Sequence, residues 1–127
     1  ILSAILPKRC ELSGSRLVFN SPDDDDPQNM KGFANLVRDP NGKVEGILYR
    51  LSKDAIQYLD RTERGYRRDE VTIEVDGKEQ KAYVYVAMQT KDGLRPKREY
   101  RDLILAAARQ NGLSEGYIKV LEEVATA

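Results

Sequence analysis

The stretch RRDEVTIEVDGKEQKAYVYVA, residues 67–87, constrains the fold more than any other part of the chain. In its first half every second residue is apolar, at Val71, Ile73 and Val75, which is the period of a strand that buries one face. An Asp-Gly dipeptide follows, and this pair favours the tight turn of a hairpin. The second half then returns as the partner strand. The chain is therefore expected to build a sheet that contains this hairpin.

The segment before the hairpin predicts further short strands, separated by turns and loops rich in glycine, proline and aspartate. We expect strands at ILSAIL, RLVFN, FANLVRD and KVEGILYRL, a turn at Ser13-Gly14, a loop at 21–32 and a turn at 40–42.

Helices are predicted on both sides of the hairpin. Ser52 can cap a short helix at KDAIQYLDR, Gly112 is placed to end a helix at KREYRDLILAAARQ, and Ser114 can cap the last helix. Strands dominate up to Ala87 and helices follow, which is typical of an α+β fold. We expect a small mixed β-barrel or a strongly curved sheet with helices packed outside, C-terminal helices among them, in a single domain over residues 1–127.

Composition excludes several classes of function. The 21 basic and 21 acidic side chains cancel, so nucleic acid is not expected as a partner, and no apolar run is long enough for a membrane span. The chain has no histidine, which removes Ser-His and Cys-His nucleophile pairs and the usual zinc sites. Cys10 is the single cysteine, which fits a reducing, cytoplasmic setting.

Glu63 is the candidate functional residue, because it lies in the short connector between the first helix and the hairpin. Gly65 frees the backbone beside it, and Tyr66 could line a cleft. Two interpretations stay open at this point. Either Glu63 is a solvated loop carboxylate that pairs with Arg61 or Arg64, or it is an acid/base catalyst that the scaffold aims at a cleft.

Other motifs have simpler interpretations. The run DDDD at 23–26 could attract a divalent cation, but it lacks the spaced ligands and the glycine of a calcium loop, so we expect a solvated loop. The segment RPKREYR could hold an anionic group, although a charged start to an exposed helix is commoner. Cys10 has no histidine base and is expected to be a structural thiol. Tyr83 and Tyr85 share one face of a strand, which predicts packing.

Several motifs occur in a specific order along most of the chain. The strand VEGILYRL is followed by a helix that ends in LD, by a glutamate three residues after that aspartate, by GYRR at the entry to the hairpin, and by REY and GL in the helices. This order, from about Ala4 to Val124, resembles the γ-glutamylcyclotransferase-like family, which is also described as AIG2-like.

The resemblance implies a small β-barrel with helices packed on it, and release of 5-oxoproline from a γ-glutamyl amine, amino acid or peptide. Glu63 matches the catalytic glutamate of the family, while Tyr66 and Tyr100 match tyrosines that line the substrate pocket. This chemistry needs no metal and no cofactor. The implied partner is a small-molecule γ-glutamyl substrate, and the implied assembly is a monomer or a homodimer.

The sequence departs from the family pattern at its beginning. The family starts with a strand that leads into a Tyr-Gly-Ser-Asn-like loop, and no such tetrapeptide occurs here. The chain opens on ILSAILP without a methionine, so we expect that the N-terminal segment is missing upstream of Ile1. The alternative is a catalytically inactive relative that serves as a small-molecule-binding or protein-interaction domain. A domain used only for assembly would show a large apolar patch and no polar pocket near Glu63.

Overall fold

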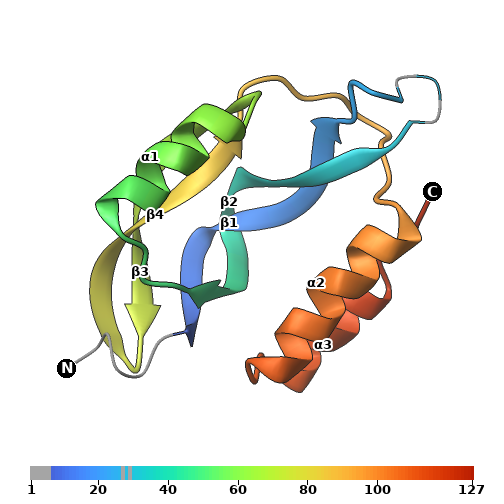
Figure 1. Cartoon of the computed structure of the whole chain (residues 1–127). Coiled ribbons are helices and arrows are strands. Elements are labelled where there is room, and N and C mark those ends of the chain that lie inside the picture. Colours follow the sequence, from blue (N-terminus) through green and yellow to red (C-terminus); the bar gives the residue numbers. More distant parts are fainter. Residues whose placement is uncertain (1–6, 27, 29) are drawn as a thin grey trace.

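The computed structural model describes residues 7–26, 28 and 30–127. Four strands and three helices form within this part of the chain: β1 Lys8–Pro22, β2 Gly32–Leu48, α1 Lys53–Thr62, β3 Tyr66–Val75, β4 Lys78–Ala87, α2 Arg98–Gln110 and α3 Glu115–Glu122. The strands make one sheet in the order β2-β1-β3-β4, and its ladders are antiparallel. Figure 1 shows that the sheet is strongly curved. The predicted α+β fold with a curved sheet is therefore confirmed.

The closed barrel is the part of the fold prediction that fails, because the outer strands β2 and β4 form no ladder in the described residues. A side chain joins these strands instead. Asn35 Oδ1 on β2 accepts a hydrogen bond from the backbone N–H of Ala87 on β4, at 2.9 Å, and Asn35 Nδ2 donates to Asn20 Oδ1 at 2.8 Å. Asn35 is buried, with 4% of its surface exposed. One amide therefore holds together two edges that a barrel would join by a ladder.

Two predicted turns are β-bulges inside continuous strands. The ladder between β1 and β2 passes from the pair Ser13↔Lys43 to the pair Ser15↔Arg38, so Gly14 faces a looped-out segment at 39–42. Gly14 has φ +82°, and a Cβ on Gly42 would lie 2.4 Å from the Ser15 carbonyl oxygen. The glycines do mark a special local backbone. Whether the chain reverses its direction at such a glycine depends on pairing with distant parts of the chain. Here the pairing of β1 with β2 continues past the glycines, so the two strands bend and do not reverse. The strand predicted at ILSAIL lies outside the described residues.

The hairpin and the helix ends agree with the sequence prediction. Asp76 and Gly77 both have positive φ, at 52° and 78°, as the tight turn between paired Val75 and Lys78 requires. The Ser52 hydroxyl accepts a hydrogen bond from the backbone N–H of Ala55 at 3.1 Å and caps α1. The Ser114 hydroxyl accepts one from Tyr117 in the same way and caps α3.

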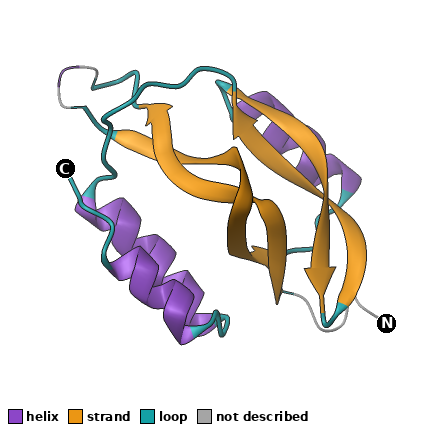
Figure 2. Ribbon diagram, turned by 180° about the vertical axis from the view of Figure 1, so that it is seen from behind, coloured by secondary structure: helices purple, strands orange, loops and turns teal. Residues whose placement is uncertain are grey.

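The helices cover the sheet from two sides, with the strands between them (Figure 2). Helix α1 lies along β3 and β4, and the α2–α3 pair lies beside β1 and β2 (Figure 1). The main apolar cluster belongs to the second pair and consists of Leu105, Ala108, Leu113 and Leu121, with Leu17 of β1 and Ile47 of β2 packed against it. No helix in the described residues is long and apolar enough to cross a membrane.

Candidate functional site

The connector after α1 is fixed by backbone hydrogen bonds. Glu63 ends the helix, and its N–H donates to the carbonyl oxygen of Leu59 at 2.8 Å. Gly65 has φ +81°, a conformation that suits glycine, and this bend turns the chain into β3. The Gly65 carbonyl oxygen accepts a hydrogen bond from the N–H of Met88, 2.8 Å away, just after β4. The backbone that carries Glu63 is therefore tied both to its helix and to the end of the sheet.

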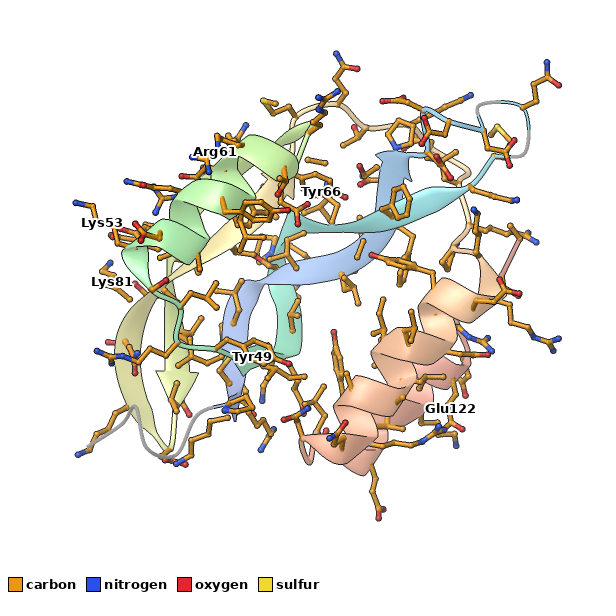
Figure 3. The ribbon with its side chains drawn as sticks, viewed as in Figure 1. Tyr49, Lys53, Arg61, Tyr66, Lys81 and Glu122 are labelled. Atoms are coloured by element: carbon orange, nitrogen blue, oxygen red, sulfur yellow. The ribbon has the colours of Figure 1, made fainter. Side chains whose placement is uncertain are left out.

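Three residues singled out in the sequence line the same cleft. Glu63 from the connector, Tyr66 from the start of β3 and Tyr100 from the first turn of α2 all contribute to a cleft of about 1010 Å³. Figure 3 shows Tyr66 between the end of α1 and β2. The loop after β1 supplies another part of the wall through residues 23–25. A polar cleft beside Glu63 is the feature that an assembly-only domain was expected to lack.

The Glu63 side chain is exposed at this cleft. Among the described residues, neither Arg61 nor Arg64 forms an ion pair with it, so the predicted pairing is not observed. Its charge nevertheless acts on the cleft. Burial raises the pKa of the Tyr66 hydroxyl, the neighbouring Tyr100 and Glu63 raise it further, and a hydrogen bond with the Ser21 side chain opposes the shift.

The two cleft tyrosines bind the same residue of β2. The Tyr66 hydroxyl donates to the carbonyl oxygen of Ala34 at 3.0 Å, and the Tyr100 hydroxyl accepts from the N–H of Ala34 at 3.1 Å. The Tyr100 ring also meets the rings of Phe33 and Phe19 edge to face, with centroids 5.3 Å and 6.2 Å away. These contacts hold the two tyrosines side by side in one wall of the cleft. They also give hydrogen-bond partners to the backbone N–H and carbonyl group of Ala34 on the outer strand β2.

The acidic loop and the thiol show structural roles. Asp23 is 8% exposed, lies 3.7 Å from the Lys97 ammonium, and accepts a hydrogen bond from the N–H of Asp25. In the described residues no group of three acidic or thiol side chains could hold a metal ion.

Cys10 is half-buried, and burial raises the pKa of its thiol, which disfavours the reactive thiolate. In RPKREYR, Arg101 donates to the carbonyl oxygens of Glu122 and Val124 after α3.

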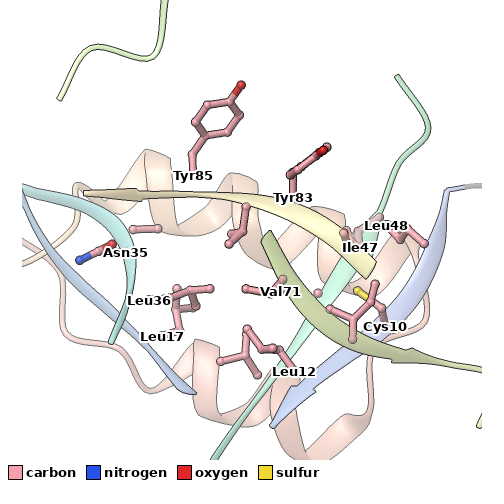
Figure 4. A pocket seen from close by; sticks show the side chains of 16 residues that line it. Cys10, Leu12, Leu17, Asn35, Leu36, Ile47, Leu48, Val71, Tyr83 and Tyr85 are labelled. Atoms are coloured by element: carbon pink, nitrogen blue, oxygen red, sulfur yellow. The ribbon is translucent and has the colours of Figure 1, made fainter. Parts of the chain in front are cut away.

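A second cavity, of about 290 Å³, lies inside the curve of the sheet and is largely apolar. Figure 4 shows the side chains of Leu12, Leu36 and Val71 gathered in it, while the rings of Tyr83 and Tyr85 stand on the other side of β4. The two tyrosines share a face of β4 as predicted, although Tyr83 is 57% exposed there. Few polar groups line this cavity, so it offers less acid/base chemistry than the cleft at Glu63.

Outside the apolar cavity, Tyr83 and Tyr85 contact charged groups near α1. The Tyr83 ring lies 4.4 Å from the guanidinium carbon of Arg68. The Tyr85 hydroxyl donates to Asp60 of α1 at 2.6 Å. Partial burial and this bond to Asp60 raise the pKa of Tyr85 to about 12. The bond links α1 to β4 three residues before Glu63.

Sequence reasoning missed the part of β2 that holds the two cleft tyrosines in place. Ala34 contributes only backbone groups to the tyrosines, and these carry no sequence signal. Asn35 has a signal that could have been used, because it is a polar residue inside the apolar strand FANLV. A polar side chain on the inner face of a strand is expected to have hydrogen-bond partners.

Sequence comparison relates the chain to known proteins. The profile of the AIG2-like family matches residues 43–121. A γ-glutamylcyclotransferase of Mus musculus is 29% identical over 98 residues, which are 73% of this chain and 52% of the mouse protein. A γ-glutamylcyclotransferase of Bos taurus is 27% identical over 128 residues, or 96% of this chain and 68% of the bovine protein. The chain thus spans about half the length of the mouse relative and about two thirds of the bovine one.

Solved structures share the fold. A structure named gamma-glutamyl cyclotransferase matches with a TM-score of 0.84 and 22% identity, covering 94% of this chain and 74% of that chain. YkqA from Bacillus subtilis matches with a TM-score of 0.78 and 22% identity, covering 94% of this chain and 45% of that one. At this identity the likeness concerns the fold alone.

Proposed function

Because the chain belongs to the AIG2-like family, we propose that it releases 5-oxoproline from a γ-glutamyl amine, amino acid or peptide. The observation that carries the proposal is the convergence of Glu63, Tyr66 and Tyr100 on one cleft. The mouse and bovine relatives, both named γ-glutamylcyclotransferase, support it. Glu63 is the proposed general acid/base, and the two tyrosines form the proposed substrate-binding wall.

The reaction is an intramolecular acyl transfer. The α-amino nitrogen of the substrate forms a bond to its own γ-carbonyl carbon, a five-membered lactam closes, and the bond from that carbon to the leaving nitrogen breaks. One proton leaves the attacking nitrogen, and one reaches the leaving nitrogen. A single carboxylate can carry this proton, first as base and then as acid. Because both reacting groups belong to one molecule, holding the folded conformer of the substrate supplies much of the acceleration.

The geometry of the connector suits this role for Glu63. Its backbone is anchored at Leu59 and, through Gly65, at the end of β4, so the carboxylate is presented from a fixed point of the cleft wall. Its oxygens have no hydrogen-bond or ion-pair partner among the described residues and are available to a substrate.

A binding domain without catalysis is the second candidate, and the exposure of Glu63 favours it. A general acid/base is most effective in a site that excludes water, and Glu63 lies exposed at the cleft. Both candidates use the same cleft. They differ in whether the chemistry of Glu63 matters after the ligand is bound.

Release of 5-oxoproline, measured by mass spectrometry, tests the proposal. The panel contains γ-glutamyl amino acids, γ-glutamyl-lysine and glutathione, and each compound is incubated with this 127-residue chain. We expect release from at least one substrate and a loss of at least about 100-fold in Glu63→Gln, since general acid/base groups contribute about 10²- to 10⁴-fold.

Glu79→Gln is the matched control, because it removes a carboxylate that is exposed on β4 and does not line the cleft. It should keep full activity. Release that survives Glu63→Gln contradicts the acid/base role. A folded protein that binds γ-glutamyl compounds and releases no 5-oxoproline from any of them supports the binding domain.

A further inference from the structure

The cleft beside Glu63 is lined by charges of unequal number. Four acidic side chains line it, three of them in the loop at 23–25 and the fourth at Glu63. Among the described residues of its wall, Arg64 is the one cation. Lys97 lies 3.7 Å from Asp23 and offsets part of this acidity, but it does not line the cleft. A ligand that carries a carboxylate therefore meets acidic groups and a single cation there.

The guanidinium group of Arg64 is uncommitted. The side chain is exposed, and within the described ranges of the chain it has neither an ion pair nor a hydrogen bond. Its backbone is nevertheless fixed. The N–H of Arg64 donates to the carbonyl oxygen of Thr62 at 2.9 Å, and the carbonyl oxygen of Gly65 accepts from the N–H of Met88 at 2.8 Å. An arginine held in this way presents a planar fork of donors that matches a carboxylate.

We propose that Arg64 binds a carboxylate of the substrate, beside the amine on which Glu63 acts. The inference rests on the proposed function for the identity of the ligand. A γ-glutamyl amino acid carries two carboxylates with the required chemistry, namely the α-carboxylate of the glutamyl group and the carboxylate of the leaving amino acid. The α-carboxylate shares a carbon atom with the attacking amine. A base and a cation on consecutive residues, whose Cα atoms lie about 3.8 Å apart, suit two such neighbouring groups. A leaving-group carboxylate bound by Arg64 would instead select γ-glutamyl amino acids over γ-glutamyl amines.

The variants Arg64→Gln and Arg61→Gln form a matched pair. Each removes one positive charge from an exposed position, and Arg61 does not line the cleft. Thermal unfolding should stay close to that of the wild type in both variants. We expect kcat/KM for 5-oxoproline release from γ-glutamyl-glycine to fall about 10- to 100-fold in Arg64→Gln, because a hydrogen-bonded ion pair is lost, and less than about twofold in Arg61→Gln. Arg64→Lys should recover part of the loss, since it keeps the charge but not the fork of donors.

Two substrates identify the carboxylate. γ-Glutamyl-glycine and γ-glutamyl-ethylamine have leaving groups of similar size, but the second lacks the carboxylate. A loss in Arg64→Gln with both substrates assigns Arg64 to the α-carboxylate, and a loss confined to γ-glutamyl-glycine assigns it to the leaving group. Both results support the inference. Full activity of Arg64→Gln with both substrates, or an equal loss in Arg61→Gln, overturns it while leaving the proposed function intact.

A binding measurement decides the matter if no 5-oxoproline is released. Isothermal titration calorimetry with γ-glutamyl-glycine compares the wild type, Arg64→Gln and Arg61→Gln. Binding that is at least about tenfold weaker in Arg64→Gln alone upholds the role of Arg64, and the chain is then a binding domain and not a cyclotransferase. Equal affinities in the three proteins, or no binding by the wild type, overturn the inference. The proposed function thus fails on product release, whereas this inference fails on recognition of the carboxylate.

Discussion

Helix α1 and the α2–α3 pair pack on the same sheet in different ways. No residue of α1 is buried, and its contacts include the polar bond between Asp60 and Tyr85. The α2–α3 pair carries the main apolar cluster, which includes Leu105 and Leu121. The proposed catalytic residue, Glu63, follows the lightly packed helix, whereas Tyr100 belongs to the well-packed one. The comparison teaches that one side of this cleft is backed by an apolar core, whereas the other is held by backbone and polar hydrogen bonds.

The largest expected effect comes from breaking the well-packed side. Leu121→Ala removes a side chain that is 2% exposed, and we expect it to lower the free energy of unfolding by about 2–5 kcal/mol. Leu59→Ala on α1 is the matched change at a half-buried position and should cost less than half as much. Urea unfolding followed by circular dichroism compares them. Equal costs would mean that α1 is as firmly packed as α3.

A carboxylate also contributes to the well-packed side. Glu45 on β2 accepts hydrogen bonds from the Ser114 backbone N–H, at 2.8 Å, and from Arg9, at 3.0 Å. Burial alone would raise the pKa of Glu45, but the hydrogen bonds from the Ser114 side chain and backbone and from Arg9 outweigh it, so the pKa is lowered. Folding therefore favours the ionised form, which links β2 to the start of α3.

The pH dependence of stability follows from that direction. A group whose folded-state pKa is depressed stabilises the fold above its unfolded pKa, and this contribution is lost as the pH falls through the folded-state pKa. We expect Glu45→Gln to flatten the acid side of a plot of unfolding free energy against pH, measured with urea from about pH 3 to pH 7. The exposed Glu79→Gln should keep the slope of the wild type. Parallel curves for wild type and Glu45→Gln would show that this carboxylate does not drive acid destabilisation.

The smallest expected effect on stability comes from removing the serine caps at the N-termini of α1 and α3. Ser52 and Ser114 cap α1 and α3 with the same bond, so each serine-to-alanine change removes one cap, at about 0.5–2 kcal/mol. We expect Ser52→Ala to raise amide hydrogen exchange within α1 alone. Ser114→Ala should lower global stability more, because Ser114 also binds Glu45. Exchange spread over the whole sheet in Ser52→Ala would contradict a locally held α1.

Local sequence signals predicted the elements well and their arrangement less well. The alternation around Ile73, the Asp-Gly turn and the capping serines act over a few residues, and the structure reproduces them. The prediction of chain-reversing turns at Gly14 and Gly42 was wrong. A β-bulge and a chain reversal both need the backbone freedom of glycine, and only the pairing between distant strands determines which of the two forms.

The candidate site could be predicted residue by residue only through the family resemblance. The local sequence around Glu63 favoured a solvated carboxylate, and only the family resemblance favoured a catalyst. The meeting of Tyr66 and Tyr100 at Ala34 depends on backbone groups of a strand far away in the chain, which no side-chain pattern records. The roles of these residues remain proposals.

The amide of Asn35 has a consequence for the order in which the chain folds. Its bond to Ala87 joins positions 52 residues apart, whereas β3 and β4 meet through a two-residue turn. Short loops close at a lower entropic cost than long ones, so the hairpin is expected to form early and the Asn35 contact late. The final curvature of the sheet, and with it the position of β2 beside the two tyrosines, would then be set in the last steps of folding.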